Sequence, residues 1–285
     1  FNHIGKVTDC MNFLREEGTN SIRLRVWVNP EGGWCGKDDV IAKAWRAQQL
    51  GFRLMIDFHY SDTWADPGNQ KVPAAWQGYT AEQMKQAVAD HTKDVLTTLK
   101  DRGVTNVEWV QVGNETRDGM LWNSDEAVTG QVSKNADNFA AYVNAGYDAV
   151  KAVYPQAKVI VHVDEGNNLG RYTWLFGELK KKGGKWDVIG MSLYPEDNNW
   201  QDLTTNCLNN IKTLSEQYNC NVIISEIGMW WGSGQAAPMM KKMVDGCKAI
   251  STCEGIFYWE PEVYNNWKPA NYITLGWSAD QPRVI

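Results

Sequence analysis

Residues 107–115 read VEWVQVGNE, a run of strand-forming residues that ends in a glycine, Asn114 and Glu115. A strand interior excludes an ionised carboxylate unless it is paired, because removing the charge from water is costly. At the C-terminal end of a strand the same carboxylate can face a cleft. The stretch therefore predicts a buried strand that carries an amide and a carboxylate to one edge of a sheet.

Other apolar runs in the chain have the same character, and segments with apolar residues at helical spacing lie between them. Strands are expected at residues 21–28, 53–60, 107–115, 158–164, 188–195, 221–228 and 255–261. Helices are expected at residues 6–17, 38–51, 80–103, 134–154, 171–182, 201–219 and 236–250. Two helix ends have local signals: Thr80 and Gln83 form a capping-box pattern, and Gly51 is a helix-ending residue.

Strand–helix alternation of this kind predicts an α/β fold with a parallel sheet covered by helices. We expect a (β/α)8 TIM barrel and not a doubly wound sheet, because no glycine-rich phosphate-binding sequence follows the first strand. The helix at residues 6–17 precedes every strand found. We therefore expect the first barrel strand to lie upstream of residue 1 and the final helix to be absent after residue 261. Residues 1–285 are expected to form a single domain, incomplete at both ends.

The charge and hydropathy of the chain argue against several classes of function. The net charge is −6 and the pI is about 5.3, whereas a nucleic-acid-binding surface needs a basic patch. No apolar stretch approaches the roughly 20 residues that span a bilayer. The 15 tryptophans instead indicate a surface on which sugars or other apolar faces can stack.

The cysteine and histidine content sets limits on disulfides and metals. The chain has 6 cysteines and 4 histidines, and no two cysteines form a Cys-x-x-Cys pair, so a zinc site is not expected. An even number of cysteines fits three disulfide bonds in an oxidising compartment, and it fits six buried thiols as well. The sequence leaves both alternatives open.

Polar and aromatic residues stand near the C-terminal end of nearly every predicted strand, which is the active-site face of a (β/α)8 barrel. Taken singly, each has a structural explanation, such as a salt bridge or a core contact. Their joint occurrence at one edge has no packing explanation and favours a functional site. The residues are Arg25, Trp27, Asp57, His59, Asp62, Asn114, Glu115, His162, Asp164, Tyr194, Glu226, Trp259 and Glu260.

Glu115 and Glu226 come from strands on opposite walls of the predicted barrel. Hydrolysis of a glycosidic bond needs a proton donor at the leaving oxygen and a carboxylate that meets the oxocarbenium-like carbon, about 5–5.5 Å apart in retaining enzymes. The pair therefore predicts glycoside hydrolysis without a metal or organic cofactor. We expect apolar surroundings and the charge of Glu226 to keep Glu115 protonated before the first step.

Several motifs together resemble one known family, the endo-β-1,4-galactanases (arabinogalactan endo-β-1,4-galactanases) of glycoside hydrolase family 53, clan A. The resemblance extends from about residue 10 to residue 277, and the HYSDTWADPG block is highly specific. The motifs are RLRVWVNP (23–30), DFHYSDTWADPGNQ (57–70), PAAW (73–76), VQVGNET (110–116), GMLW (119–122), VHVDEG (161–166), GMSLYP (190–195), SEIG (225–228) and FYWEP (257–261).

The resemblance implies a catalytic domain that cleaves β-1,4-galactosidic linkages internally, with retention, in the (arabino)galactan side chains of pectin. It maps Glu115 to the acid/base and Glu226 to the nucleophile of a double displacement. It also implies that Asn114 holds the 2-hydroxyl of the reacting sugar, and that Tyr194 hydrogen-bonds the nucleophile.

The same resemblance implies further contacts with the substrate. Arg25 would support the nucleophile electrostatically, and Trp259 would form the floor of the reacting subsite. The remaining residues that it maps to the sugar-binding cleft, or that we add as candidate sugar platforms, are His59, Asp62, Asp164, Trp64, Trp122 and Trp230.

Two alternatives stay open: another clan-A retaining endo-glycanase, such as a mannanase or glucanase, and a carbohydrate-binding protein without catalysis. No metal site is expected, because the candidate calcium ligands Glu262, Asn265, Asn266 and Asn271 lack a clear ligand spacing. We expect a polysaccharide as the partner, with no nucleic acid and no membrane-spanning segment. We also expect a monomer with a secreted, cell-surface or periplasmic location.

Overall fold

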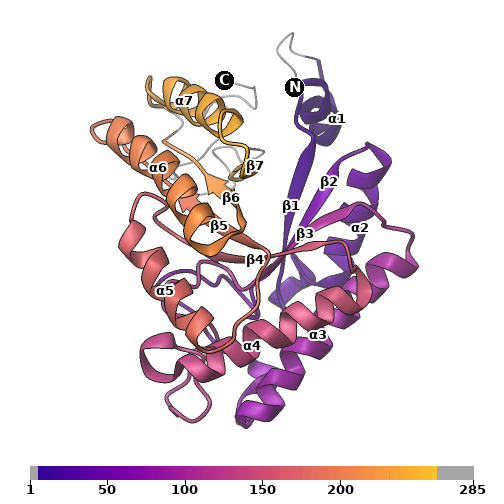
Figure 1. Ribbon diagram of the computed structural model, residues 1–285. Helices are drawn as coiled ribbons and strands as arrows, with labels where there is room; N and C mark the ends of the chain where they lie inside the picture. The colour runs from indigo at the N-terminus through magenta and orange to yellow at the C-terminus, as the bar shows by residue number, and fades with distance from the viewer. Residues whose placement is uncertain (1–5, 231, 262–285) are drawn as a thin grey trace. The chain divides into compact units, whose positions relative to one another are not determined.

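The computed structural model describes residues 6–230 and 232–261. In this part of the chain β-strands alternate with α-helices, and the strands follow one another in the sheet in chain order (Figure 1). The pairs β1–β2, β2–β3, β3–β4 and β6–β7 are parallel, which confirms the predicted (β/α)8-barrel class. The strands are β1 (Ser21–Val26), β2 (Arg53–Phe58), β3 (Val107–Val112), β4 (Lys158–Val163), β5 (Val188–Leu193), β6 (Asn221–Ile227) and β7 (Cys253–Tyr258).

Each predicted helix is present, and its ends differ from the prediction by a few residues. Thr80 caps α3 in a capping box with Gln83, and Gly51 takes a φ of 77° directly after the C-cap of α2, so both end signals are confirmed. The helices are α1 (Cys10–Glu16), α2 (Lys37–Gln49), α3 (Ala81–Asp101), α4 (Val132–Val153), α5 (Leu169–Lys181), α6 (Trp200–Tyr218) and α7 (Ala236–Lys248), with short 3-10 helices η1 (Glu31–Gly33) and η2 (Ala74–Trp76).

The strands end up to three residues before their predicted C-terminal ends. β3 stops at Val112, because Gly113 and Glu115 take positive φ angles of 82° and 45° that an extended strand does not contain. Glycine is required at position 113, since a Cβ there would lie 2.6 Å from Cγ2 of Thr116. This turn takes Asn114 and Glu115 off the β3 ladder at its C-terminal end.

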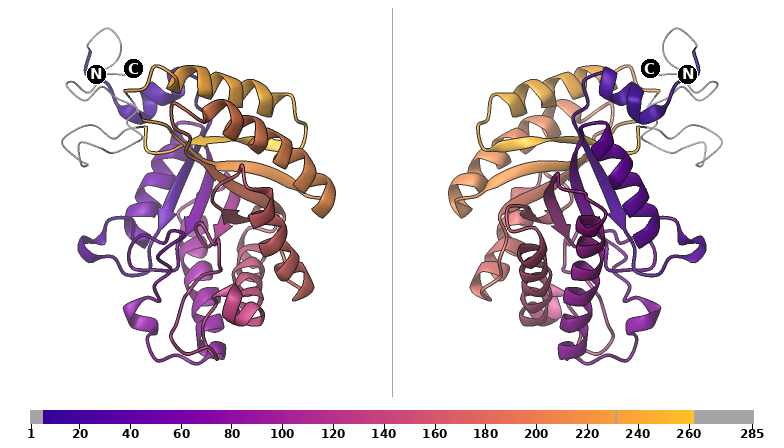
Figure 2. Two further views of the ribbon diagram at one scale, coloured as in Figure 1. Left: turned by 90° about the vertical axis from the view of Figure 1, so that its left-hand side faces the viewer. Right: turned by 90° about the vertical axis from the view of Figure 1, so that its right-hand side faces the viewer.

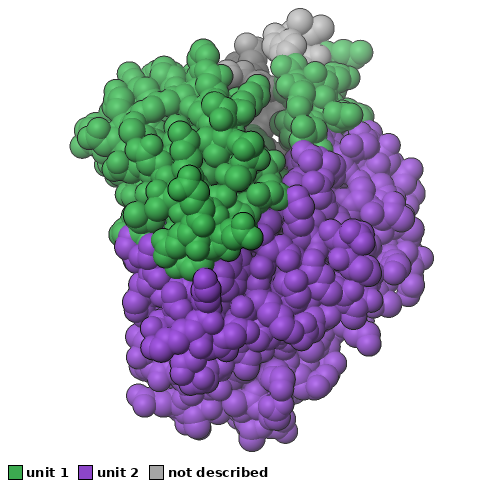
Figure 3. All heavy atoms as spheres, in the orientation of Figure 1, with its two compact units in different colours: residues 1–20, 165–169, 191–285 green, residues 21–164, 170–190 purple. Residues whose placement is uncertain are grey.

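The chain divides into two compact units (Figure 3). Unit 2 comprises residues 21–164 and 170–190 and contains β1–β4, α2–α4 and most of α5. Unit 1 comprises residues 1–20, 165–169 and 191–285, and its described part contains α1, α6, α7, β6 and β7. Strand β5 is divided between the units after Gly190.

The core of unit 2 lies between its strands and the apolar faces of its helices. Every residue of β2 from Leu54 to Phe58 is buried, as expected for a strand covered on both faces. Helices α3 and α4 lie side by side (Figures 1 and 2), and α3 turns a fully buried apolar face to the core. The α3 residues on that face are Met84, Val88, Val95, Leu96 and Leu99.

The core of unit 1 is built in the same way. Strand β6 is buried from Val222 to Ile227 and pairs with β7. Helices α6 and α7 lie close to each other beside this pair (Figure 2) and bury apolar residues such as Leu214 and Met243. The carboxylate of Glu226 therefore stands on the buried part of a core strand.

Some predictions fall beyond the part of the chain that the structure describes. These are the absence of a final helix after residue 261 and the candidate calcium ligands Glu262, Asn265, Asn266 and Asn271. Among the helices of the described residues, none has the length and apolar character needed to cross a membrane.

Candidate active site

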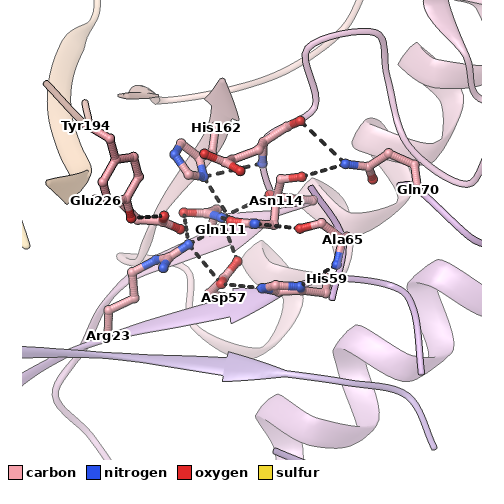
Figure 4. Close-up of polar contacts among 12 residues, drawn as sticks. Arg23, Asp57, His59, Ala65, Gln70, Gln111, Asn114, His162, Tyr194 and Glu226 are labelled. Carbon is pink, nitrogen blue, oxygen red and sulfur yellow. Dashed lines mark hydrogen bonds and ion pairs between the residues drawn. The ribbon is translucent and has the colours of Figure 1, made fainter. Parts of the chain in front are cut away.

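An ion pair between Arg23 and Asp57 lies at the centre of a buried polar network in unit 2 (Figure 4). Nη2 of Arg23 is 2.8 Å from Oδ2 of Asp57, and neither side chain is more than 7% exposed. Burial alone would raise the pKa of Asp57, but the charge of Arg23 and the contacts of His59 outweigh it and hold that pKa below its usual value. The Asp57 carboxylate is therefore ionised at neutral pH and bonded to both Arg23 and His59.

Asn114 is the most heavily bonded member of this network (Figure 4). Its Oδ1 accepts hydrogen bonds from Arg23 (2.8 Å) and from Nε2 of Gln111 (3.0 Å). Its Nδ2 donates to the backbone carbonyl of Ala65 over 2.8 Å. The side-chain orientation of Asn114 is fixed by these contacts, and one of its two N–H donors remains for another acceptor.

The two strand-end histidines of unit 2 are buried parts of the network. The backbone N–H of Ala65 donates to Nδ1 of His59 (3.0 Å), so the proton of the neutral ring sits on Nε2 and donates to Asp57 (3.0 Å). Nδ1 of His162 lies 3.0 Å from Oδ1 of Asn114. Burial, followed by the charge of Arg23, holds the pKa of His162 well below its usual value, so this ring is neutral.

Glu115 follows Asn114 in a backbone conformation that is rare for a residue with a side chain, with a φ of 45°. Its carbonyl oxygen accepts a hydrogen bond from the backbone N–H of Arg117 (2.8 Å). The next residue, Thr116, donates its backbone N–H to the carbonyl of His162 over 2.8 Å. The peptide group that follows Glu115 is thus hydrogen-bonded through both its carbonyl and its N–H.

Arg25 lies two residues along β1 from Arg23, and its side chain packs against tryptophans. Its guanidinium carbon is 4.0 Å from the ring centroid of Trp64 and 5.5 Å from that of Trp27. These distances place it in cation–π contact with Trp64. One face of Trp64 is therefore covered by Arg25, and the role of Trp64 as a sugar platform stays a prediction.

Three further predicted sugar contacts have internal partners in unit 2. Asp62 accepts backbone N–H bonds from Asn29 (3.0 Å) and Ala74 (2.8 Å), which ties together the loops after β1 and β2. Asp164 forms ion pairs with two arginines, one of them Arg171 at 2.8 Å. The indole N–H of Trp122 donates to the carbonyl of Asp118 over 2.9 Å. Direct sugar contact by these residues and by His59 stays a prediction.

In unit 1, Glu226 and Tyr194 are in direct contact (Figure 4). The Tyr194 hydroxyl donates to Oε2 of Glu226 over 2.7 Å, and Glu226 is only 4% exposed. The backbone N–H of Trp259 donates to the carbonyl of Ile227 over 2.9 Å, which places Trp259 beside the C-terminal end of β6. Tyr194, Glu226 and Trp259 thus come from the ends of β5, β6 and β7, as the sequence predicted.

A shallow depression of about 500 Å³ opens beside Tyr194 in unit 1. Trp230 contributes to its wall and is 50% exposed, which is unusual for an indole. The depression combines aromatic and polar side chains, as carbohydrate-binding surfaces do. Its lining residues are Tyr194, Pro195, Glu196, Asp197, Asn198, Gly228, Met229 and Trp230.

Sequence reasoning missed Arg23, Gln111 and Gln70 as members of the site. Arg23 and Gln111 had a signal, because each is a polar residue inside an otherwise apolar strand and shares a face with a predicted site residue, Arg25 or Asp57. Gln70 had no such signal, since it belongs to a loop. Its contacts are visible only in the folded chain.

The described residues contain no group of three or more His, Cys, Asp or Glu side chains that could hold a metal ion. All six cysteines are free thiols in the structure, but they are not all buried, as the thiol alternative had supposed. Cys35, Cys207 and Cys247 are buried, and the other three are partly exposed.

Comparisons with known proteins agree with this architecture. The sequence model for glycosyl hydrolase family 53 matches residues 1–237. A Niallia circulans protein, described as an uncharacterized protein in the bgaB 5' region, is 36% identical over 231 residues. The match covers 80% of this chain and 62% of that protein, so the chain spans less than two thirds of its length.

Two further similarities extend over most of the chain. The arabinogalactan endo-β-1,4-galactanase of Thermothelomyces thermophilus is 28% identical over 287 residues, which are 92% of this chain and 83% of that protein. A solved structure of a fungal β-1,4-galactanase superposes with a TM-score of 0.88 at 25% identity, covering 100% of this chain and 91% of that chain. Because the family model matches well over half of the residues, the chain belongs to glycosyl hydrolase family 53.

Proposed function

We propose that the protein is an endo-β-1,4-galactanase that hydrolyses (arabino)galactan with retention of configuration. Family membership and the similarity to an arabinogalactan endo-β-1,4-galactanase support this proposal. The single observation that carries it is the buried carboxylate of Glu226, which accepts a 2.7 Å hydrogen bond from the Tyr194 hydroxyl on a strand that is buried from Val222 to Ile227. A buried carboxylate oriented by a hydrogen-bond donor suits a nucleophile.

In the proposed reaction, Glu226 attacks the anomeric carbon while Glu115 donates its proton to the departing glycosidic oxygen. The sugar is then attached to Glu226 through an ester bond, and the aglycone leaves as an alcohol. In the second step Glu115 accepts a proton from water, which attacks the anomeric carbon and releases Glu226. Asn114 would donate its remaining N–H to the 2-hydroxyl of the reacting sugar, since its other N–H is held by Ala65.

Other residues of the site have supporting roles in this proposal. Trp259 would form the floor of the reacting subsite, and Trp230 would stack on a neighbouring galactose at the depression beside Tyr194. Arg25 would contribute positive charge near the nucleophile, although its contact with Trp64 also makes it part of the wall. His59, Asp62 and Asp164 would act chiefly by holding the loops and backbone that line the glycone side.

The natural substrate in this proposal is the galactan side chain of pectin. The protein would act outside the cell, at the cell surface or in the periplasm, because a polysaccharide cannot enter the cell intact. It would work as a monomer without a cofactor, since the chemistry needs only two carboxylates and water.

The test is incubation with linear β-1,4-galactan and, in parallel, β-1,4-mannan and β-1,4-glucan, with sizing of the products over time. The proposal expects a rapid fall in galactan chain length before short products accumulate, and no cleavage of the other two polymers. Preferential cleavage of mannan or glucan would identify another retaining endo-glycanase. Binding of galactan without new reducing ends would identify a carbohydrate-binding protein.

A further inference from the structure

Gln70 reaches from the loop after β2 to the backbone of Asn114 (Figure 4), and it also approaches the backbone of Glu115. Its Nε2 donates to the carbonyl of Asn114 over 2.8 Å and lies 3.4 Å from the carbonyl of Glu115. The same nitrogen is 3.0 Å from the carbonyl of Asp66, within its own loop. Gln70 is 2% exposed, so these bonds form away from solvent.

The backbone that Gln70 contacts lies beyond the end of the β3 ladder. β3 ends at Val112, and Glu115 takes a left-handed conformation that a non-glycine residue rarely adopts. Such a conformation persists only where surrounding contacts determine it. The direction of the Glu115 side chain depends on the peptide groups on either side of it, and Gln70 bonds to both of their carbonyls.

Gln70 is itself fixed from the opposite direction. Its backbone carbonyl accepts the N–H of Trp122 over 2.7 Å, so the loop after β3 holds the residue in place. The three carbonyls around Nε2 also determine the orientation of its amide, because exchanging nitrogen and oxygen would oppose oxygen to oxygen. Within the described residues, its buried Oε1 has no hydrogen-bond partner. Nε2 is therefore the atom through which the Gln70 side chain holds the surrounding backbone.

We propose that Gln70 is a positioning residue for general acid catalysis, which holds the backbone of Asn114 and Glu115 so that the Glu115 carboxyl points at the departing glycosidic oxygen. This inference rests on the proposed role of Glu115 as the acid/base. Gln70 touches neither the substrate nor the reacting atoms. It acts only through the peptide groups that it holds.

The role predicts a specific kinetic defect. A misdirected acid slows departure of a sugar alcohol, which needs a proton, and hardly affects a leaving group that departs as a stable anion. In Gln70→Ala and Gln70→Met, kcat/KM on linear β-1,4-galactan should fall about 10- to 100-fold, since small misplacements of catalytic groups cost up to about that much. On a 2,4-dinitrophenyl β-galactobioside, kcat/KM should stay within about threefold of the unmodified protein.

The matched control is Gln77→Ala. Gln77 lies in the same loop region, and its Nε2 donates to the carbonyl of Val72 over 3.0 Å, but it has no bond to the Asn114–Glu115 pair. This variant should retain both activities. Gln70→Met preserves the length of the side chain and removes only its polar atoms, so it tests the donor if the alanine variant does not fold.

Equal losses of kcat/KM on both substrates in Gln70→Met would overturn the proposal, because they would indicate general damage to the fold. Unchanged cleavage of galactan would overturn it as well. Failure of the proposed function would look different, since the unmodified protein would then cleave neither substrate. As a reference for a lost acid, Glu115→Ala should show the same dependence on the leaving group in stronger form.

Discussion

The hydroxyl of Tyr194, at the end of β5, donates a 2.7 Å hydrogen bond to Oε2 of Glu226 on β6. Tyr194 follows Leu193, whose carbonyl accepts the N–H of Gly228 over 3.3 Å. A backbone bond thus joins the ends of the two strands, and it fixes where the hydroxyl meets the carboxylate. Within the proposed mechanism, this contact orients the nucleophile before it meets a sugar.

Tyr194→Phe removes that donor and leaves the ring in place. We expect kcat/KM on β-1,4-galactan to fall about 10- to 100-fold, because a hydrogen bond to a charged group is worth about 1.5–3 kcal/mol. Tyr218→Phe is the matched control. The Tyr218 hydroxyl accepts a hydrogen bond from Gln217 on α6, and Tyr218 has no role in the proposed mechanism. Equal activity of the two variants would show that Tyr194 does not support catalysis.

Replacement of Glu226 itself should abolish turnover. In Glu226→Ala the nucleophile is gone, and added azide or formate should restore cleavage of an activated substrate by attacking the anomeric carbon in its place. Glu216→Ala, on the exposed side of α6, is the control and should retain full activity. Normal galactan cleavage by Glu226→Ala would remove Glu226 from the mechanism.

The stereochemistry of the first product tests the proposed double displacement. Proton NMR of the reducing end at early times should show the β anomer, because two successive inversions restore the original configuration. The α anomer should appear only later, through mutarotation. An α product at the earliest time points would mean that water attacks directly, and the assignment of Glu226 as nucleophile would then be wrong.

Much of the fold could be predicted because the spacing of apolar residues in each segment matches either a helix or a strand, but not both. β2 was recognised as a strand because its apolar run is short and rich in strand formers, and all of it from Leu54 to Phe58 is buried. The start of α3 followed from the Thr80–Gln83 capping box. The end of β3 was less accurate, since the left-handed turn at Gly113 and Glu115 depends on contacts distant in sequence.

The polar partners of the site residues could not be predicted in the same way. Arg23 and Arg25 lie on the same face of β1, and nothing in their spacing shows which one reaches Asn114. The structure gives that contact to Arg23, while Arg25 packs on Trp64. Likewise, the sequence places Asp164 at the end of a strand without indicating any partner for its carboxylate. In the structure it pairs with arginines 47 and 7 residues away along the chain. Such pairings depend on tertiary placement.

The Arg23–Asp57 pair should also contribute to stability. Asp57→Ala removes a buried carboxylate that is ion-paired with Arg23, so we expect a loss of about 3–5 kcal/mol in the free energy of unfolding. The matched control, Asp94→Ala, breaks the exposed pair with Lys37 and should cost at most about 1 kcal/mol. Urea denaturation at neutral pH measures both. Similar losses in the two variants would mean that the buried pair contributes no more to the free energy of unfolding than the exposed pair.

His91 on α3 should make the free energy of unfolding depend on pH. Its ring makes edge contacts with Phe58, Tyr60 and Trp76. Its buried Nε2 has no hydrogen-bond partner among the described residues. Burial, against the raising effect of Asp94, lowers the pKa of His91 from 6.5 to about 4. Below pH 6.5 the unfolded chain therefore takes up a proton at this histidine that the folded chain refuses until about pH 4.

It follows that His91 removes stability as the pH falls from 6.5 to about 4 and has no further effect at lower pH. The loss is at most about 3 kcal/mol, from the difference between the two pKa values.

His91→Phe keeps an aromatic ring in contact with Phe58, Tyr60 and Trp76 and cannot bind a proton. Urea denaturation of both proteins between pH 4 and 7.5 should show a shallower decline for the variant. His162 contributes a decline of the same sign to both proteins, so it cancels in the comparison. Parallel curves would show that His91 takes up its proton equally in the folded and unfolded chains, contrary to its burial.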